Sequence, residues 1–103
     1  MYKLCFFVPE SHVETVKNAV FLTGAGYIGN YDQCCWQVMG TGQFRALQGS
    51  QPFTGLQGQL HKLSEWKVEI VCEDHLIEQA VAAMKKAHPY EEVAYDVIKL
   101  EVI

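Results

Sequence analysis

The sequence holds little positive charge and no long apolar run. Lys and Arg together number 8, against 12 Asp and Glu, and the formal net charge is −4. Arg45 is the only arginine, and no basic run is longer than Lys85-Lys86. Binding to nucleic acid depends on clustered basic side chains, so we expect no nucleic-acid partner. No apolar stretch approaches the roughly 20 residues that a membrane span needs, so we expect no membrane segment.

We also expect no secretory leader, because Met1 runs directly into a strand pattern. The four cysteines are Cys5, Cys34, Cys35 and Cys72. Three of them lie inside apolar strand patterns, where a free cysteine behaves as a small hydrophobic residue. We therefore expect reduced thiols rather than disulfides, and a cytoplasmic protein.

Apolar material is plentiful by comparison. Half of the 103 residues are hydrophobic and 19% are charged, which is below the roughly 25% of an average soluble domain. The length fits one domain spanning residues 1–103. The surplus of apolar side chains indicates that part of the surface is covered by another chain.

The chain repeats its pattern at a shift of 64 residues, which places Lys3 on Lys67. Segment 2–39 aligns with segment 66–103 without a gap, and the apolar positions of the two segments coincide. Repeats of this kind indicate duplicated structural units. We therefore expect two equivalent strand–helix–strand halves, 2–39 and 66–103, joined by an insert at 40–65.

In the first half, apolar residues alternate from Tyr2 to Val8, as in a strand with one buried face. Ser11 and Glu14 have the spacing of a capping box, so Ser11 is the predicted first cap of a helix. Glycines at Gly24 and Gly26 end that helix. The second strand is predicted over 31–39, with Cys34, Trp36 and Val38 on one face.

The second half follows the same logic. Apolar residues alternate from Trp66 to Cys72, and Asp74 is the predicted helix cap. A stripe at helical spacing runs from Ile77 to Met84. Pro89 excludes the helical conformation for the residue before it, so the helix ends there. The last strand is predicted over 93–102.

These elements predict a ferredoxin-like α+β fold, with an antiparallel sheet and two helices on one face. The insert 40–65 is rich in glycine and much longer than a plain connection. Short strands at 43–47 and 59–63 would make it a hairpin arm beyond the core.

The sheet face away from the helices is predicted to be too apolar for water. Such a face normally marks an interface, so we expect a homo-oligomer, a trimer or a dimer. The residues assigned to this face are Cys5, Phe7, Tyr31, Cys35, Met39, Val71, Tyr95 and Val97.

No catalytic constellation stands out. The strongest candidate for chemistry is the run 88–92, where His88 and Glu91 lie three residues apart. Imidazole and carboxylate at this spacing both reach one cation, and His61 in the arm would supply a third ligand. The alternative interpretation is a helix end, a proline stop and solvated carboxylates.

Several motifs together resemble the YqfO (Nif-three-like) family, and in particular the insert domain of its longer members, the GTP cyclohydrolase type 2 homologues. The resemblance covers nearly the whole chain. It is carried by Gly24-Ala25-Gly26, Ile28-Gly29-Asn30-Tyr31, Gly40-x-Gly42-x-Phe44, Gly49-Ser50-Gln51-Pro52-Phe53-x-Gly55 and His88-Pro89-Tyr90-Glu91-Glu92-x-Ala94-Tyr95-Asp96.

The resemblance implies a PII- and CutA-like domain, which is ferredoxin-like and trimeric. Longer members carry a two-metal centre on flanking domains, and the ligands of that centre have no matching positions here. The resemblance therefore implies a stand-alone insert domain rather than a complete enzyme. One departure is His61, which stands where the family pattern leads us to expect an acidic residue.

The sequence thus favours a small oligomeric binding or regulatory module, which is not an enzyme, over two alternatives. We expect a small ligand or a divalent metal at clefts between subunits. Ligand contacts are predicted at Gly42, Phe44, Pro52 and Tyr90. The alternatives are a metal-dependent hydrolase, as in the longer relatives, and a module that binds a protein partner.

Overall fold

The computed structural model describes all residues, 1–103. Four strands, two α-helices and two single-turn 3-10 helices alternate along the chain. Their order is β1 (Tyr2–Pro9), η1 (Glu10–His12), α1 (Val13–Phe21), β2 (Trp36–Arg45), β3 (Leu60–Cys72), η2 (Asp74–Leu76), α2 (Ile77–Ala87) and β4 (Tyr95–Lys99).

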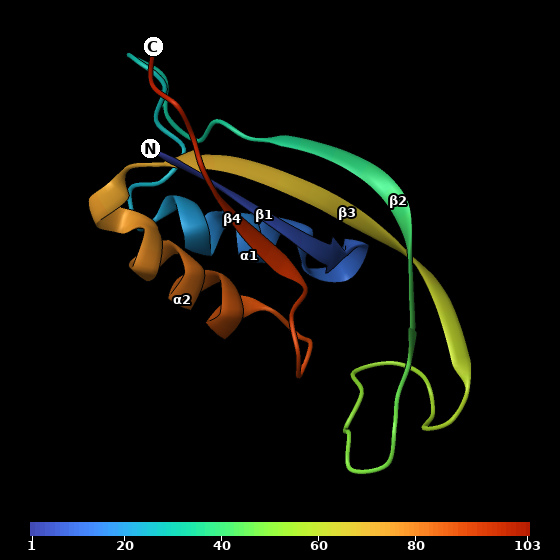
Figure 1. Ribbon diagram of the computed structural model, residues 1–103. Helices are drawn as coiled ribbons and strands as arrows, with labels where there is room; N and C mark the ends of the chain where they lie inside the picture. The colour runs from blue at the N-terminus through green and yellow to red at the C-terminus, as the bar shows by residue number, and fades with distance from the viewer.

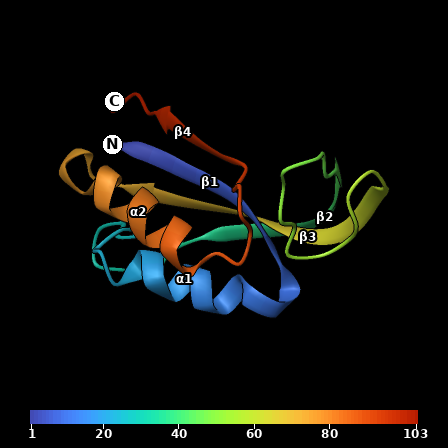
Figure 2. The ribbon, with the colours of Figure 1, turned by 90° about the horizontal axis from the view of Figure 1, so that it is seen from below.

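The strands form one antiparallel sheet in the order β2-β3-β1-β4. Both helices lie under the same face of this sheet (Figure 1), and the view from below shows them side by side across the strands (Figure 2). This arrangement is the predicted ferredoxin-like α+β fold. The chain has no helix that is both long and apolar enough to cross a membrane.

The two halves match closely through their first strand and helix. The same shift of 64 residues relates η1 to η2. It also relates the start of α1 at Val13 to the start of α2 at Ile77. The match ends after the helices. β4 begins at Tyr95 after a short turn, whereas β2 begins only at Trp36 after a long loop at 22–35, so the prediction of a strand starting at residue 31 is wrong.

Strand β2 begins later than predicted because residues 22–35 form a loop with contacts of its own. The amide of Gly26 donates to the carbonyl of Val71 at 2.8 Å, which fastens the loop to β3. Gly26 has a φ of +88°, and a Cβ there would lie 2.8 Å from the ring of Phe21. Ile28 and Tyr31 then pair with each other across a tight turn.

The predicted helix caps do not form, because a 3-10 turn precedes each α-helix. Ser11 lies inside η1, and its hydroxyl contacts the ring of His12 at 2.8 Å instead of capping α1. Glu14 pairs with Lys17 at 2.9 Å. Neither α-helix has a side-chain cap, so the capping box at Ser11 and Glu14 is a wrong prediction.

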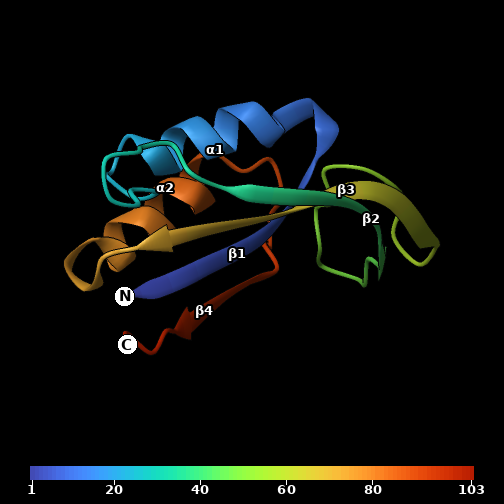
Figure 3. The same ribbon diagram turned by 90° about the horizontal axis from the view of Figure 1, so that it is seen from above.

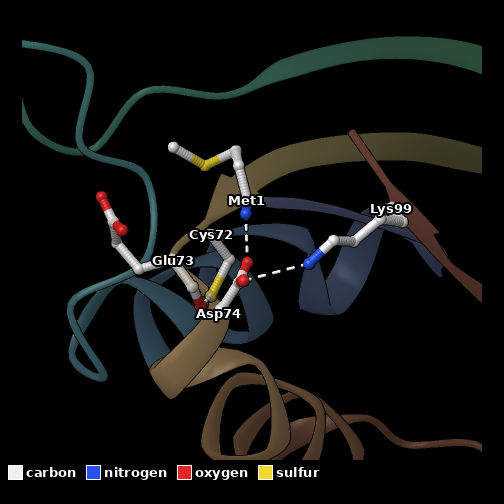
Figure 4. Close-up of polar contacts among 5 residues, drawn as sticks. All are labelled: Met1, Cys72, Glu73, Asp74 and Lys99. Carbon is white, nitrogen blue, oxygen red and sulfur yellow. Dashed lines mark hydrogen bonds and ion pairs between the residues drawn. The ribbon is translucent and has the colours of Figure 1, made fainter. Parts of the chain in front are cut away.

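Asp74 joins three chain segments rather than capping a helix (Figure 4). Its carboxylate accepts a hydrogen bond from the Met1 amino group and one from the Lys99 ammonium, the latter at 3.0 Å. These two bonds, the first being the larger cause, lower the pKa of Asp74. The start of β1, the end of β4 and the turn before α2 are thereby held together.

The core lies between the helices and the two central strands. Phe6, on β1, is fully buried and lies at its centre. Burial of an apolar side chain of this size contributes about 1.5–3 kcal/mol. The other members of this cluster are Leu4, Val8, Val13, Val16, Val20, Ala25, Val68, Ile70, Cys72, Ala80 and Met84.

The open face of the sheet differs from the prediction in both edge strands. Residues paired directly across strands share a face, and Met39, Tyr95 and Val97 pair with Trp66, Phe6 and Leu4 on the helix side. Their assignment to the open face is therefore wrong.

Tyr31 and Cys35 lie outside the strands, so their assignment to this face is also wrong. Strand register places Cys5, Phe7 and Val71 on the open face, as predicted. The other residues on this face are Trp36, Val38 and Ile98, together with Lys3, Lys67, Glu69 and Asp96.

The predicted hairpin arm is present, but its strands are continuous with β2 and β3. The last pair between β1 and β3 is Pro9 with Glu65, so residues 41–64 form a two-stranded arm with no third strand beside them. The view from above shows this arm extending past β1 and bending away from the sheet (Figure 3). Its loop, 46–59, turns back toward the core.

His88 fixes the turn between α2 and β4. Pro89 holds it in the extended conformation, with φ −74° and ψ 139°, so α2 ends at Ala87 as predicted. The Nδ1 atom of His88 accepts from the amide of Tyr90 at 3.1 Å, and Nε2 therefore donates to the carbonyl of Phe7 at 2.7 Å. The imidazole is neutral and buried, and it replaces the strand neighbour that β1 lacks beyond Phe6.

We expect the stability of the chain to fall in mild acid because of His88. Burial lowers the pKa of His88, so below about pH 6.5 the unfolded chain binds the proton more readily than the folded chain. The free energy of unfolding should therefore decrease as pH falls from about 7.5 to about 5.5. His88→Gln, which donates and accepts but does not titrate, should show a shallower decrease in urea unfolding.

The control is His75→Gln, because His75 is exposed and its substitution should leave the pH dependence of the wild type unchanged. Equal pH slopes for wild type and His88→Gln would contradict the assignment.

Candidate functional site

A cavity of about 420 Å³ opens at the end of the sheet from which the arm projects. It lies between the arm, with its loop, and the turn that connects α2 to β4. Both of these segments project from the same end of the sheet (Figure 1). Its walls come from Phe7 at the end of β1, segment 43–47, loop residues 50–54, Glu65 on β3 and segment 90–94.

The arm wall is built on two stacked rings. Phe44 of β2 and His61 of β3 face each other across the hairpin, with ring centroids 5.6 Å apart and planes 18° apart. The loop approaches the other side of His61 at Gly55, where a Cβ would lie 2.3 Å from the ring. The amide of Leu56 donates to His61 Nε2 at 3.3 Å. His61 therefore organises the loop.

The loop closes against the core through aromatic contacts. Phe53 meets His12 edge-on at 5.6 Å and Tyr90 at 6.1 Å. The amide of Gln51 donates to Glu91 Oε2 at 2.9 Å, which joins the loop directly to the α2–β4 turn. Contacts between segments so distant in sequence give the cavity a defined second wall.

Gly42 shapes the cavity indirectly. A Cβ at this position would lie 1.8 Å from Glu65 Oε1, so glycine here lets the Glu65 carboxylate lie over the strand, and any other residue would displace it. The hydroxyl of Tyr90 is buried beside the carboxylate of Glu65. Burial, followed by the neighbouring Glu65 carboxylate, raises the pKa of Tyr90. A carboxylate and a neutral hydroxyl thus lie close together beside the cavity.

The four predicted ligand contacts fall in one region of the structure. Phe44, Pro52 and Tyr90 line the cavity, and Gly42 lies behind Glu65 rather than in the wall. Their grouping follows from the folding of the arm loop onto the α2–β4 turn. Ligand contact by these residues stays a prediction.

The three predicted metal ligands do not come together. His88 uses both ring nitrogens in hydrogen bonds, Glu91 accepts from Gln51, and His61 accepts from Leu56 within the arm. No three His, Cys, Asp or Glu side chains in the chain are grouped so as to hold a metal ion. A site built from His88, Glu91 and His61 is therefore not present in the single chain.

Sequence reasoning missed Phe7 and Glu65, which both line the cavity. The sequence correctly predicts Phe7 on the open face of the sheet. It does not show that the cavity lies at the edge of that face, where Phe7 lines it. Glu65 sits where the apolar alternation of β3 begins, and Gly42 lies near it across the hairpin. A glycine in a strand often marks the close approach of another group, and that signal could have pointed to Glu65.

Comparison with known proteins gives close sequence relatives. A GTP cyclohydrolase 1 type 2 homolog from Halalkalibacterium halodurans is 45% identical over 100 residues, which cover 97% of this chain and 27% of the relative. The protein of the same name from Mycobacterium tuberculosis is 44% identical over 98 residues, covering 95% and 26%. The chain thus spans about a quarter of the length of these relatives.

Solved structures agree with this relationship. A Bacillus cereus protein related to NIF3 superposes with a TM-score of 0.84 at 40% identity, covering 98% of this chain and 26% of that one. The PII-like protein CutA from Nostoc superposes with a TM-score of 0.70 at 16% identity, covering 98% and 82%. At that identity the likeness to CutA establishes the fold alone.

No family model matches the chain. The relatives and the solved structure of 40% identity nevertheless align with it from end to end. The chain is therefore homologous, over nearly its whole length, to a segment that makes up about a quarter of the Nif3-like GTP cyclohydrolase 1 type 2 homologues, and it has the fold of the PII-like protein CutA.

Proposed function

We propose that the chain is a binding module that holds a small molecule in the cavity between the arm and the α2–β4 turn. The observation that carries this proposal is the cavity itself, which has about 420 Å³ of space. Its size falls in the range of about 300–1,000 Å³ typical of small-molecule sites. Apolar walls with a few polar groups, as here, are also typical of such sites.

The proposal is supported by the way the walls are held. Contacts from Phe53 to His12 and Tyr90, and from Gln51 to Glu91, hold the loop against the core through the chain's own side chains. A site that is formed before the ligand arrives loses less conformational entropy on binding. Regulation would then act through the arm, which carries one wall.

Hydrolysis is the second function considered, because the relatives bear the name of a cyclohydrolase. No three metal-ligating side chains of the chain lie together. Metal-dependent hydrolysis therefore ranks below small-molecule binding as a proposal. The alternative requires a tightly held metal, and elemental analysis after purification tests it. Less than about a tenth of a metal ion per chain would remove it, because catalytic zinc sites retain their ion.

We further propose that the chain works as a homo-oligomer in the cytoplasm. Trp36 is 62% exposed and Ile98 is 50% exposed on the open face of the sheet. Lys3 and Glu69 form an ion pair at 3.6 Å on the same face. Apolar groups around balanced charges suit a surface that packs on a copy of itself.

The cysteines support a reducing compartment. All four are free thiols, and burial raises the pKa of Cys5 and of Cys72, so the reactive thiolate is disfavoured at both.

Ligand binding is tested by filling the cavity. Thr54→Trp places a large ring in the cavity wall, and it should weaken binding by about tenfold or more for any compound found in a screen of nucleotides, amino acids and divalent metal salts. The screen is read by thermal shift and NMR titration. Gln48→Trp is the matched control, because Gln48 is exposed in the same loop and does not line the cavity.

Two results would contradict the binding module. One is a screen in which no compound shifts the melting temperature or the spectrum. The other is a ligand whose affinity is unchanged in Thr54→Trp, since that ligand would occupy another site.

Assembly is tested by light scattering at micromolar concentration. The wild type should give a mass that is a multiple of 11.7 kDa, and Trp36→Glu combined with Ile98→Lys should give the monomer. Leu22→Asp is the control, because Leu22 is 89% exposed at the end of α1, away from the open face. A wild-type mass of one chain refutes self-association through this face.

A further inference from the structure

We infer that the ligand of the cavity is an organic cation, meaning an ammonium or guanidinium group carried on an aromatic or alkyl body. This inference rests on the proposed function and names the chemical class that the same cavity takes. Three features of the cavity support it, namely its charge, a half-buried carboxylate that forms no ion pair, and its aromatic walls.

The charged groups of the cavity are mostly acidic. Glu65, Glu91 and Glu92 line it, and Arg45 is the only cation among the lining residues. Arg45 forms no ion pair with any of these carboxylates, and three carboxylates against one guanidinium leave the lining with a net negative charge. Concave surfaces that carry charge of one sign concentrate ligands of the opposite sign.

Glu65 is the most buried of the three carboxylates, and it lies at the root of the arm. Its carboxylate is half-buried over Gly42 and forms no ion pair. The buried Tyr90 hydroxyl lies beside this carboxylate, which is, after burial, one cause of the raised pKa of Tyr90. Charge-assisted hydrogen bonds from an N–H donor to a carboxylate are among the strong ones in proteins. A ligand ammonium would satisfy Glu65, and its remaining N–H groups could reach the hydroxyl.

The aromatic walls suit the same ligand. Phe7, Phe44, Phe53 and Tyr90 line the cavity, and the rings of Phe53 and Tyr90 adjoin at 6.1 Å. The faces of such rings attract cations, and cages of aromatic rings recognise organic ammonium groups. The apolar body of the ligand would bury its surface against the same rings.

Other ligand classes fit less well. A divalent metal needs several oxygen ligands around one point, and the carboxylates of the cavity do not converge in that way. Ligands rich in phosphate would meet three glutamates and one arginine. Aromatic rings do not coordinate metals or phosphate oxygens, whereas they do contribute to binding an organic cation.

The test compares three indoles that differ in one terminal group. Tryptamine is cationic, indole-3-propionamide is neutral and indole-3-propionate is anionic. Isothermal titration calorimetry with the wild-type chain should show tryptamine binding about tenfold or more tighter than the amide, with the propionate weakest. The advantage of tryptamine should shrink as salt is added, because ions screen partly exposed charges.

Variants locate the effect. Glu65→Gln should weaken tryptamine about tenfold and leave the amide nearly unchanged. Glu69→Gln is the matched control, because Glu69 lies on the same strand outside the cavity and pairs with Lys3. If Glu65→Gln fails to fold, Glu92→Gln serves instead, since Glu92 lines the cavity and is exposed.

The outcomes separate this inference from the proposed function. Binding of the amide or the propionate as tight as that of tryptamine, abolished by Thr54→Trp, overturns the cation inference and leaves the binding module intact. An equal loss of tryptamine affinity in Glu65→Gln and Glu69→Gln also overturns it. If none of the three indoles binds, the cation inference is wrong, and the broader ligand screen decides the binding module separately.

Discussion

The site depends on one neutral imidazole. β4 runs beside β1 only as far as Phe6, so the carbonyl of Phe7 would otherwise face the gap beside the sheet. His88 fills that gap, because it donates to Phe7 and accepts from Tyr90 at the same time. Tyr90 is thereby held where the arm loop can reach it, and the cavity acquires its fixed wall. Without this bridge the turn would have no defined position relative to the sheet.

The fold follows from the sequence where local pattern and tertiary packing agree. The alternating residues Leu4, Phe6 and Val8 and the stripe from Ile77 to Met84 face the core as expected, because both patterns match the period of their element. The edge strands are different. Trp36 and Ile98 are apolar and yet lie on the open face, so an apolar side chain in an edge strand does not tell which face of the sheet it occupies.

The helix starts and the candidate site show the limit of spacing arguments. Ser11 and Glu14 have the right separation for a cap, but a 3-10 turn shifts the start of α1 and removes the geometry. Segment 88–92 and the glycine-rich arm were recognisable from sequence as the parts of a site. The role of Glu65 was not, because its position over Gly42 depends on strand register across the hairpin.

The two-stranded arm separates what keeps the chain folded from what decides its ligand. The twelve residues of the core cluster all lie outside residues 41–64, whereas much of one wall of the cavity belongs to that segment. Substitutions or length changes in the arm can therefore alter the shape and selectivity of the cavity at little expense in folding stability. The sheet and helices thus form a scaffold on which the binding surface can be changed independently.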